Sequence, residues 1–293
     1  MKPAIHQVPG VQRRKVGNFV VTALSDGFIL LPPGAVQGIT AADSDARYKA
    51  AGRRMPCRTA INAYLIHGPS HTILIDAGCG DFMGPHLGRV PANLDAAGVR
   101  PDEIDLVLIT HMHTDHVGGL LSADRKTAYP RARVMMDAKE LAYWSDRRNH
   151  DSSPESTRDS FDVVAQILSA YHGRIDTFEG GTDITAGLKA LPLSGHTPGH
   201  TGFEIGAGAD AMIIWGDVSH APELQLGLPD LTVIFDADPE RAIASRRSIF
   251  ERAVNEDLVV AGMHMPFPGF TRLARSGDAY VSLPQVWQYE LLD

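Results

Sequence analysis

The chain has 293 residues, of which 44% are hydrophobic and 21% are charged, and its formal net charge is −8. This composition is typical of a globular protein with a sizeable core, and the negative charge argues against a nucleic-acid partner, which requires a basic surface. No segment has the apolar length of a signal peptide or a membrane span. The sequence therefore predicts a cytoplasmic protein with no membrane partner.

Apolar runs with strand character alternate with helical patterns along the chain. Residues 19–24 and 63–66 are short hydrophobic runs that predict strands. Residues 87–97 and 161–171 place apolar side chains three and four positions apart, which is typical of a helix with one buried face. Asp238, Pro239 and Glu240 are a typical helix start. Strands alternating with helices predict a layered α/β architecture.

Nothing in the sequence marks a domain boundary. There is no internal repeat, low-complexity block or linker, so we predict one domain, 1–293, with an N-terminal extension of about 60 residues. Residues Gln37 to Asn62 mix Gly, Asp and Arg, which favours a surface excursion. Cys57 and Cys79 lack the CxxC spacing of redox or metal motifs, and we predict two reduced, packed thiols.

The segment His111 to His116 holds the most informative motif of the chain. Its sequence, His-Met-His-Thr-Asp-His, places three imidazoles and one carboxylate directly after the apolar run 104–109. In an extended chain His111 and His113 point to the same side, because side chains alternate with a period of two. Imidazole nitrogen and carboxylate oxygen are ligands that suit zinc and similar divalent metals. The motif therefore predicts a metal site with further ligands downstream.

Three later segments supply such ligands. His196 lies between glycine and proline residues that mark tight turns, Asp217 ends the apolar run that starts at residue 212, and His264 ends the run that starts at residue 258. A single His or Asp in such a place is more often a cap or a turn residue. The recurrence at successive strand ends favours one shared site, because rigid sheets position functional loops in this way.

The whole pattern resembles the metallo-β-lactamase superfamily, whose metal motif is H-x-H-x-D-H followed by a distant His, an Asp and a last His. The resemblance begins near Thr72 to Gly78 and runs to His264. The residues in and around the motifs, at 111–120 and 215–220, are most similar to those of methyl parathion hydrolase and the related aryl-lactone hydrolases. It implies a four-layer αββα sandwich with the metal site at one edge of the sheets. In that subgroup, an N-terminal segment contributes to a homodimer and to pocket edges.

The resemblance also implies two divalent metal ions, zinc in the first place, with iron, manganese or cobalt as alternatives. It assigns one ion to His111, His113 and His196. It assigns the other to Asp115, His116 and His264, with Asp217 bridging both. Asp115 would also act in catalysis, and a metal-bridging hydroxide would be the nucleophile. No Gly-x-Ser-x-Gly motif points to a serine nucleophile instead.

The predicted activity is therefore hydrolysis of lactones and aryl esters, with phosphotriester hydrolysis as a further activity. One alternative is a thioesterase similar to glyoxalase II, although this acidic chain shows no basic patch for a glutathione substrate. The other is an iron-dependent redox enzyme of the same fold. A non-catalytic metal-binding scaffold is disfavoured, because all seven ligand positions are filled.

Two further histidines and five aromatic residues complete the predicted site. His220 stands where lactonases of this fold commonly carry a Tyr, so it can donate a hydrogen bond or move a proton; the alternative is a solvated or supporting histidine. His200 is predicted to orient a ligand rather than to bind metal. A pocket for a hydrophobic or aromatic small-molecule lactone or ester requires apolar walls. The candidates for those walls are Phe82, Trp144, Phe161, Phe235 and Phe267.

Overall fold

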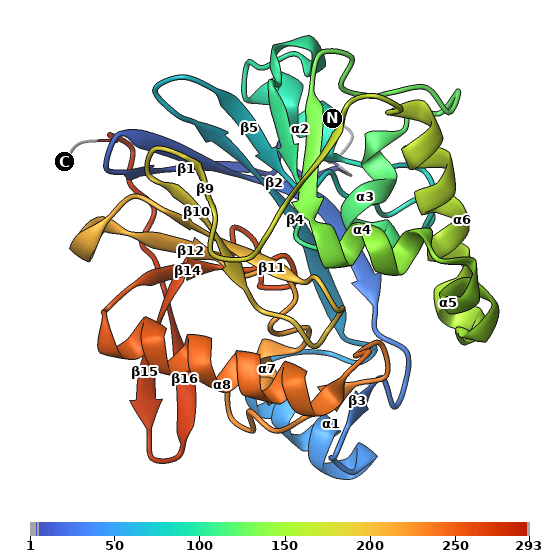
Figure 1. Cartoon of the computed structure of the whole chain (residues 1–293). Helices are drawn as coiled ribbons and strands as arrows, with labels where there is room; N and C mark the ends of the chain where they lie inside the picture. Colours follow the sequence, from blue (N-terminus) through green and yellow to red (C-terminus); the bar gives the residue numbers. More distant parts are fainter. Residues whose placement is uncertain (1–3, 5, 292–293) are drawn as a thin grey trace.

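The computed structural model describes residue 4 and residues 6–291, and two seven-stranded sheets lie face to face at its centre (Figure 1). In sheet order, the first contains β1 (Val11–Val16), β2 (Phe19–Leu30), β4 (Arg58–His67), β5 (Thr72–Ile75), β6 (Leu106–Leu108), β7 (Arg133–Asp137) and β8 (Ile175–Phe178). The second contains β16 (Ala279–Pro284), β15 (Thr271–Ser276), β14 (Val259–Ala261), β12 (Met212–Ile214), β11 (Thr201–Ile205), β10 (Leu188–Pro192) and β9 (Asp183–Thr185). A short pair joins β3 (Val36–Gln37) to β13 (Thr232–Val233).

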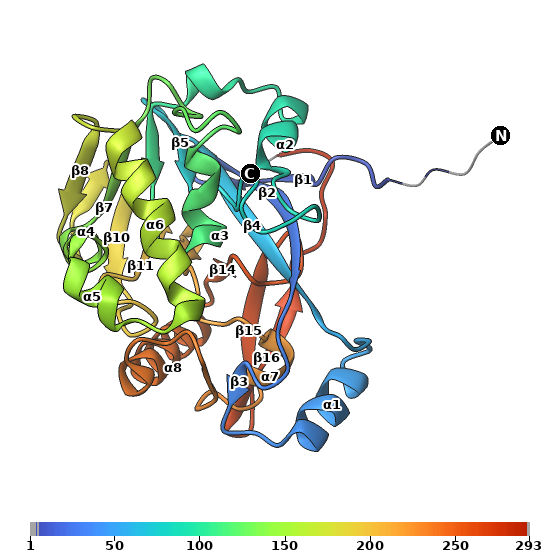
Figure 2. The ribbon, with the colours of Figure 1, turned by 90° about the vertical axis from the view of Figure 1, so that its right-hand side faces the viewer.

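Helices cover both outer faces of the sheet pair. On the first sheet lie α2 (Val90–Ala96), α3 (Thr114–Val117), α4 (Ala138–Ser145), α5 (Arg147–Ser152) and α6 (Glu155–Ala170). On the second lies α8 (Pro239–Asn255), while α1 (Ala41–Ala50) and α7 (Pro222–Gln225) pack together at one end of the molecule (Figures 1 and 2). The layer order is helix, sheet, sheet, helix, which confirms the predicted αββα sandwich.

The alternation of side chains along the strands separates the hydrophobic cores. In β5, Leu74 faces the helices of the first sheet, whereas Ile73 and Ile75 face the second sheet. All three are fully or almost fully buried, and β6 continues the same division. A third core lies between the second sheet and α8, around Phe250 and Trp215. Each sheet is thus buried on both faces, which makes the two central sheets a rigid frame.

The predicted helices are present. Residues 87–97 include α2, residues 161–171 lie almost entirely in α6, and α8 begins directly after Asp238. The side chain of Asp238 caps α8, because its carboxylate accepts a hydrogen bond from the Arg241 amide at 3.0 Å.

The predicted surface excursion 37–62 needs a correction at its end. Residues 58–62 belong to β4, and Ile61 and Asn62 are 0% and 1% exposed. The Asn62 side chain is buried because its amide donates hydrogen bonds to the carbonyls of Gly262 and Met265, at 3.2 and 2.8 Å. A polar residue that bonds to a loop 200 and 203 positions away carries no local sign of burial.

Both cysteines are free and buried, as predicted. Cys79 Sγ lies 3.7 Å from Met83 Sδ, next to the cavity described below. Within the described part of the chain, no helix combines the length and the apolar character that crossing a bilayer demands.

The strand ends that carry the motifs meet at one edge of the two sheets. The neighbours β5 and β6 are parallel in the first sheet, and β12 and β14 are parallel in the second. Backbone hydrogen bonds join the two edges: the Thr201 amide donates to the Thr110 carbonyl, and the Asn62 amide donates to the Met263 carbonyl, both at 2.9 Å. The loops after β6, β12 and β14 are therefore brought together between the sheets.

Candidate metal centre

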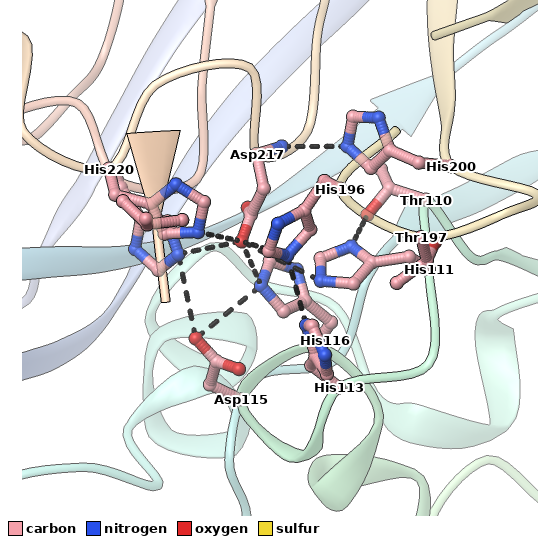
Figure 3. Close-up of polar contacts among 12 residues, drawn as sticks. Thr110, His111, His113, Asp115, His116, His196, Thr197, His200, Asp217 and His220 are labelled. Carbon is pink, nitrogen blue, oxygen red and sulfur yellow. Dashed lines mark hydrogen bonds and ion pairs between the residues drawn. The ribbon is translucent and has the colours of Figure 1, made fainter. Parts of the chain in front are cut away.

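The seven predicted ligands form one cluster at this edge (Figure 3). His111 and His113 follow β6, and Asp115 and His116 lie in the short helix α3. The other three come from the second sheet, from the turn between β10 and β11 and from the ends of β12 and β14; they are His196, Asp217 and His264. Residues more than 150 positions apart are thus held by two rigid sheets.

Asp217 stands at the centre of the cluster. Its Oδ2 atom lies within 3.6 Å of the Nε2 atoms of five histidines, namely His264 at 2.9 Å, His220 at 3.1 Å, His116 at 3.3 Å, His196 at 3.5 Å and His111 at 3.6 Å. Burying a carboxylate is costly unless cations or donors surround it. Five imidazoles converging on one buried carboxylate oxygen form a site built to hold positive charge.

The buried polar atoms of the cluster fit a metal centre. His111 Nε2, His116 Nε2 and Asp217 Oδ1 are buried without a hydrogen-bond partner. His196 Nε2 and His113 Nδ1 face each other at 3.0 Å. Unpartnered nitrogen and oxygen atoms that point to a common space are the donor set of zinc and related divalent ions. Three-residue groups able to hold a metal ion include His111–His113–His196 and Asp115–His116–His264.

The protonation equilibria of the ligands differ across the cluster. Burial lowers the pKa of His111 and of His113 well below the ordinary value, which favours the neutral, metal-binding form. Burial acts in the same direction on His116, but Asp217 and Asp115 outweigh it and raise the pKa of His116 well above its usual range. The carboxylates thus concentrate positive charge on the side of the cluster formed by Asp115, His116 and His264.

Two buried carboxylates orient ligand rings from behind. Asp76 Oδ2 lies 2.7 Å from His116 Nδ1, and Asp236 Oδ1 lies 2.9 Å from His196 Nδ1. Each holds its ring with Nε2 towards Asp217, as carboxylates behind ligand histidines commonly do. Neither role is predicted by the metal motif. The sequence does contain a sign of the role of Asp236. This residue directly follows the mostly apolar run 231–235, just as Asp217 and His264 follow apolar runs.

His200 and a backbone carbonyl complete the support. His200 Nδ1 donates to the Leu193 carbonyl at 2.8 Å, and its Nε2 accepts from the Asp217 amide at 2.9 Å. The structure thus places His200 against the backbone of Asp217, outside the ring of ligands. Gly216 permits this approach, because a Cβ there would lie 2.4 Å from His200 Nε2. His264 Nδ1 donates to the Ala60 carbonyl of β4 at 3.0 Å.

His220 belongs to the cluster. Its ring stacks on that of His264 with centroids 4.8 Å apart, and its Nε2 atom faces Asp217 Oδ2. Burial lowers the pKa of His220 to about 4. His196, Asp217 and His220 also form a group able to hold a metal ion. His220 is therefore placed either beside a bound substrate or among the ligands.

A cavity of about 460 Å³ opens onto the cluster. Its walls include His220, Asp115 and two of the predicted aromatic residues, Phe82 and Phe235. Its other apolar wall residues include Ile29, Leu31, Met83 and Val163. Helix α6 adds the polar residues Asp159, Asp162 and Gln166. This size and this mixture suit a small organic ligand.

The other three predicted wall residues do not line this cavity. Trp144 lines a second cavity of about 680 Å³ beside His113 and His196, which Phe235 also borders. Phe161 is 4% exposed and packs on Trp144 in the core, with ring centroids 4.4 Å apart. Phe267 is 37% exposed and is not among the described residues that line either cavity. The sequence shows that these residues are apolar, but it does not show which cavity each of them faces.

Comparison with known proteins agrees with this geometry. Among curated relatives, the chain is 29% identical over 172 residues to the anti-Pycsar protein Apyc1 of Paenibacillus sp., covering 57% of this chain and 64% of that protein. It is 33% identical over 76 residues to the N-acyl homoserine lactonase AiiB of Agrobacterium fabrum, covering 20% and 28%. The chain spans less than two thirds of the length of the curated relatives it matches.

Solved structures match over nearly the whole chain. The hydrolase AbOPH of the beta-lactamase superfamily superposes with a TM-score of 0.90 at 29% identity, covering 97% of this chain and 100% of that one. The dizinc quorum-quenching lactonase AidC superposes with a TM-score of 0.88 at 22% identity, covering 96% and 99%, which shows the shared fold. The family model of the metallo-beta-lactamase superfamily matches residues 58–264, from β4 to the last histidine of the cluster. The chain belongs to the metallo-β-lactamase superfamily.

Proposed function

We propose that this chain is a metal-dependent hydrolase of lactones and aryl esters that binds two divalent ions, with zinc as the leading candidate and phosphotriester hydrolysis as a further activity. The observation that carries the proposal is the position of Asp217, whose Oδ2 atom faces five imidazoles. A carboxylate has two oxygens, so Asp217 can serve the three-histidine group on one side and the Asp115 group on the other.

Bound at these residues, two divalent ions would lower the pKa of water and polarise a carbonyl or phosphoryl oxygen. The chain itself contributes the remaining steps. Asp115, whose side chain is 14% exposed and lines the cavity, is placed to accept a proton from the attacking water and to return it to the leaving oxygen. The Nε2 atom of His220 points to the same space and can donate a hydrogen bond to a substrate oxygen beside Asp217.

The cavity favours neutral substrates with an apolar part. Phe82, Phe235 and Leu31 supply apolar surface beside the ligands. Asp159 and Asp162 add negative charge to the wall of α6, which disfavours substrates whose distal part is anionic, such as glutathione thioesters. Similarity to the N-acyl homoserine lactonase AiiB supports the choice of a lactone substrate.

A panel of substrates tests the proposal. Metal-loaded protein is assayed on dihydrocoumarin, an aryl acetate, a phosphotriester and a glutathione thioester, with and without chelator. We expect chelator-sensitive hydrolysis of the lactone or the aryl ester at the highest kcat/KM. Turnover of the thioester alone would indicate a glyoxalase II-like enzyme. Oxygen consumption by iron-loaded protein without hydrolysis would indicate a redox enzyme.

Replacing His220 by Ala is expected to lower kcat on the best substrate by on the order of a hundredfold, because one donor to the developing oxyanion is lost. His220→Gln keeps an N–H donor and should retain more activity. Metal content, measured by mass spectrometry, should equal that of the parent protein in both variants. Unchanged kinetics in His220→Ala would remove His220 from the mechanism, and loss of an ion would make it a ligand.

A further inference from the structure

Glu140 is a buried carboxylate that contacts no metal ligand directly. It lies in α4, is 0% exposed, and accepts four hydrogen bonds. Its Oε1 atom accepts from the Met112 amide at 2.9 Å and from Trp144 Nε1 at 2.6 Å. Its Oε2 atom accepts from Thr197 Oγ1 at 2.7 Å and from the Gly199 amide at 3.0 Å. Both oxygens are therefore fully used, which is the condition for burying a carboxylate.

Three of the four donors come from the segments that carry one group of ligands, and the fourth, Trp144, lies in α4 itself. Met112 lies between His111 and His113, and Thr197 directly follows His196. These three histidines form the first of the metal-binding groups described above. Glu140 thus ties a loop of the first sheet to a loop of the second at the point where their ligands meet.

The packing around Glu140 shows that this approach is close. A Cβ at Gly199 would lie 2.4 Å from the Glu140 amide nitrogen and 2.6 Å from its Cβ, so a side chain at position 199 would push the loop away from α4. Trp144, one helical turn after Glu140, also packs edge-on against the His113 ring, with centroids 5.3 Å apart. The helix therefore fixes the His113 ring through Trp144 and the backbone of the preceding residue, Met112, through Glu140.

The other ligand group has a different support. His116 is held by Asp76, and His264 by the Ala60 carbonyl. Every hydrogen bond that Glu140 makes runs to α4 itself or to the two loops of the three-histidine group. Glu140 thus supports the side of the three-histidine group, whereas Asp76 holds His116 directly and reaches His111 through Thr110, whose hydroxyl lies 3.1 Å from His111 Nδ1.

We propose that Glu140 is a positioning residue that sets the affinity of the three-histidine group for its metal ion and leaves the group of Asp115, His116 and His264 unaffected. This inference rests on the proposed two-metal function. A glutamine at this position has one accepting oxygen. Its NH₂ group would face two hydrogen-bond donors and could not accept from either. The loops would move apart, and the three histidines would lose their common geometry.

The test is a zinc titration of metal-free Glu140→Gln protein, followed by calorimetry and by metal analysis after desalting. We expect the parent protein to bind two ions. In the variant, one dissociation constant should rise by about tenfold to a hundredfold while the other changes little. If the parent protein does not bind two ions, the proposed function fails. If the parent binds two and the variant binds both with unchanged affinity, the inference about Glu140 fails.

Asp26→Asn is the matched control. Asp26, in β2, is equally buried and accepts hydrogen bonds from the amides of Cys79, Gly88 and Val90, none of which is one of the seven ligands or directly adjoins one in sequence. The Asp26→Asn substitution should lower thermal stability as Glu140→Gln does. The variant protein should nevertheless bind both ions with parental affinity. Equal loss of zinc affinity in both variants would show a general effect of destabilisation and contradict the proposal.

Further variants locate the effect and guard against misfolding. Added to His113→Ala, which already lacks a ligand of the three-histidine group, Glu140→Gln should weaken zinc binding little further, whereas added to His264→Ala it should still weaken the remaining ion. Thr197→Val removes one donor only and should weaken the same ion to a smaller extent, and Thr197→Ser should restore it. Independent, additive effects of Glu140→Gln and His113→Ala would assign Glu140 to the wrong group.

Discussion

Replacing Asp217 by Asn is expected to lower hydrolysis by on the order of a thousandfold or more, because the variant loses the carboxylate that faces histidines of both ligand groups. An amide of the same shape has one accepting oxygen and no negative charge. It cannot offset the charge of two cations in a buried site. We therefore expect the purified variant to retain at most one ion per chain.

A surface carboxylate provides the control for this variant. Asp230 forms an exposed ion pair with Arg247, and Asp230→Asn removes the same charge at the surface, outside the ligand cluster. Exposed pairs of this kind contribute little to stability, so activity and metal content should match those of the parent protein. Parental activity in Asp217→Asn would show that Asp217 does not hold the metal ions.

Asp76 gives the second large effect, and two variants separate its two roles. Its carboxylate accepts from the Thr110 amide and hydroxyl at 2.8 and 2.7 Å and lies 2.7 Å from His116 Nδ1. Asp76→Ala leaves these buried groups without a partner, so we expect the free energy of unfolding to fall by about 3–5 kcal/mol, as for other broken buried pairs. Chemical denaturation measures this loss directly.

Asp76→Asn is expected to keep most of the stability and still lose metal affinity. The amide can bond to Thr110, but its N–H₂ group facing His116 would force the ring proton from Nδ1 to Nε2. That nitrogen faces Asp115 and Asp217 and has to be unprotonated to bind a metal. We expect zinc affinity to fall by about tenfold to a hundredfold. Parental affinity in Asp76→Asn, with denaturation midpoints unchanged, would contradict this role.

Three of the four ligand-bearing segments could be predicted from sequence because each directly follows an apolar run. The run before His111 is a buried strand, and so are the runs before Asp217 and His264. Four ligand-bearing segments in one chain, added to the family resemblance, were enough to predict the layered fold and the cluster. Parallel strand ends at a common edge then supplied the convergence that the motif required.

The supporting residues could not be predicted in the same way. Glu140 bonds to residues 28 and 57 positions away, and Asp236 bonds to a residue 40 positions away. Their roles depend on how loops from different sheets pack, which local patterns do not encode. One hint existed for Glu140, since a glutamate one turn before Trp144 lies on the apolar face of its helix.

The pocket walls could be predicted only in part, for a related reason. Phe82 and Phe235 face the cavity, whereas Phe161 fills the core beside Trp144. All three lie in hydrophobic surroundings, and only the tertiary arrangement separates a wall from a core position. The substrate therefore has to be identified by experiment, and the dependence of hydrolysis on bound metal can be used to test each candidate substrate.

The most direct test of the account is a reconstitution in which metal content and dihydrocoumarin hydrolysis are measured on the same samples. Metal-free protein is titrated with zinc, and bound ions per chain are plotted against kcat. The account predicts no hydrolysis without metal and full activity only as the second ion binds. Full hydrolysis by metal-free protein, or activity that is complete with one ion bound, would contradict it.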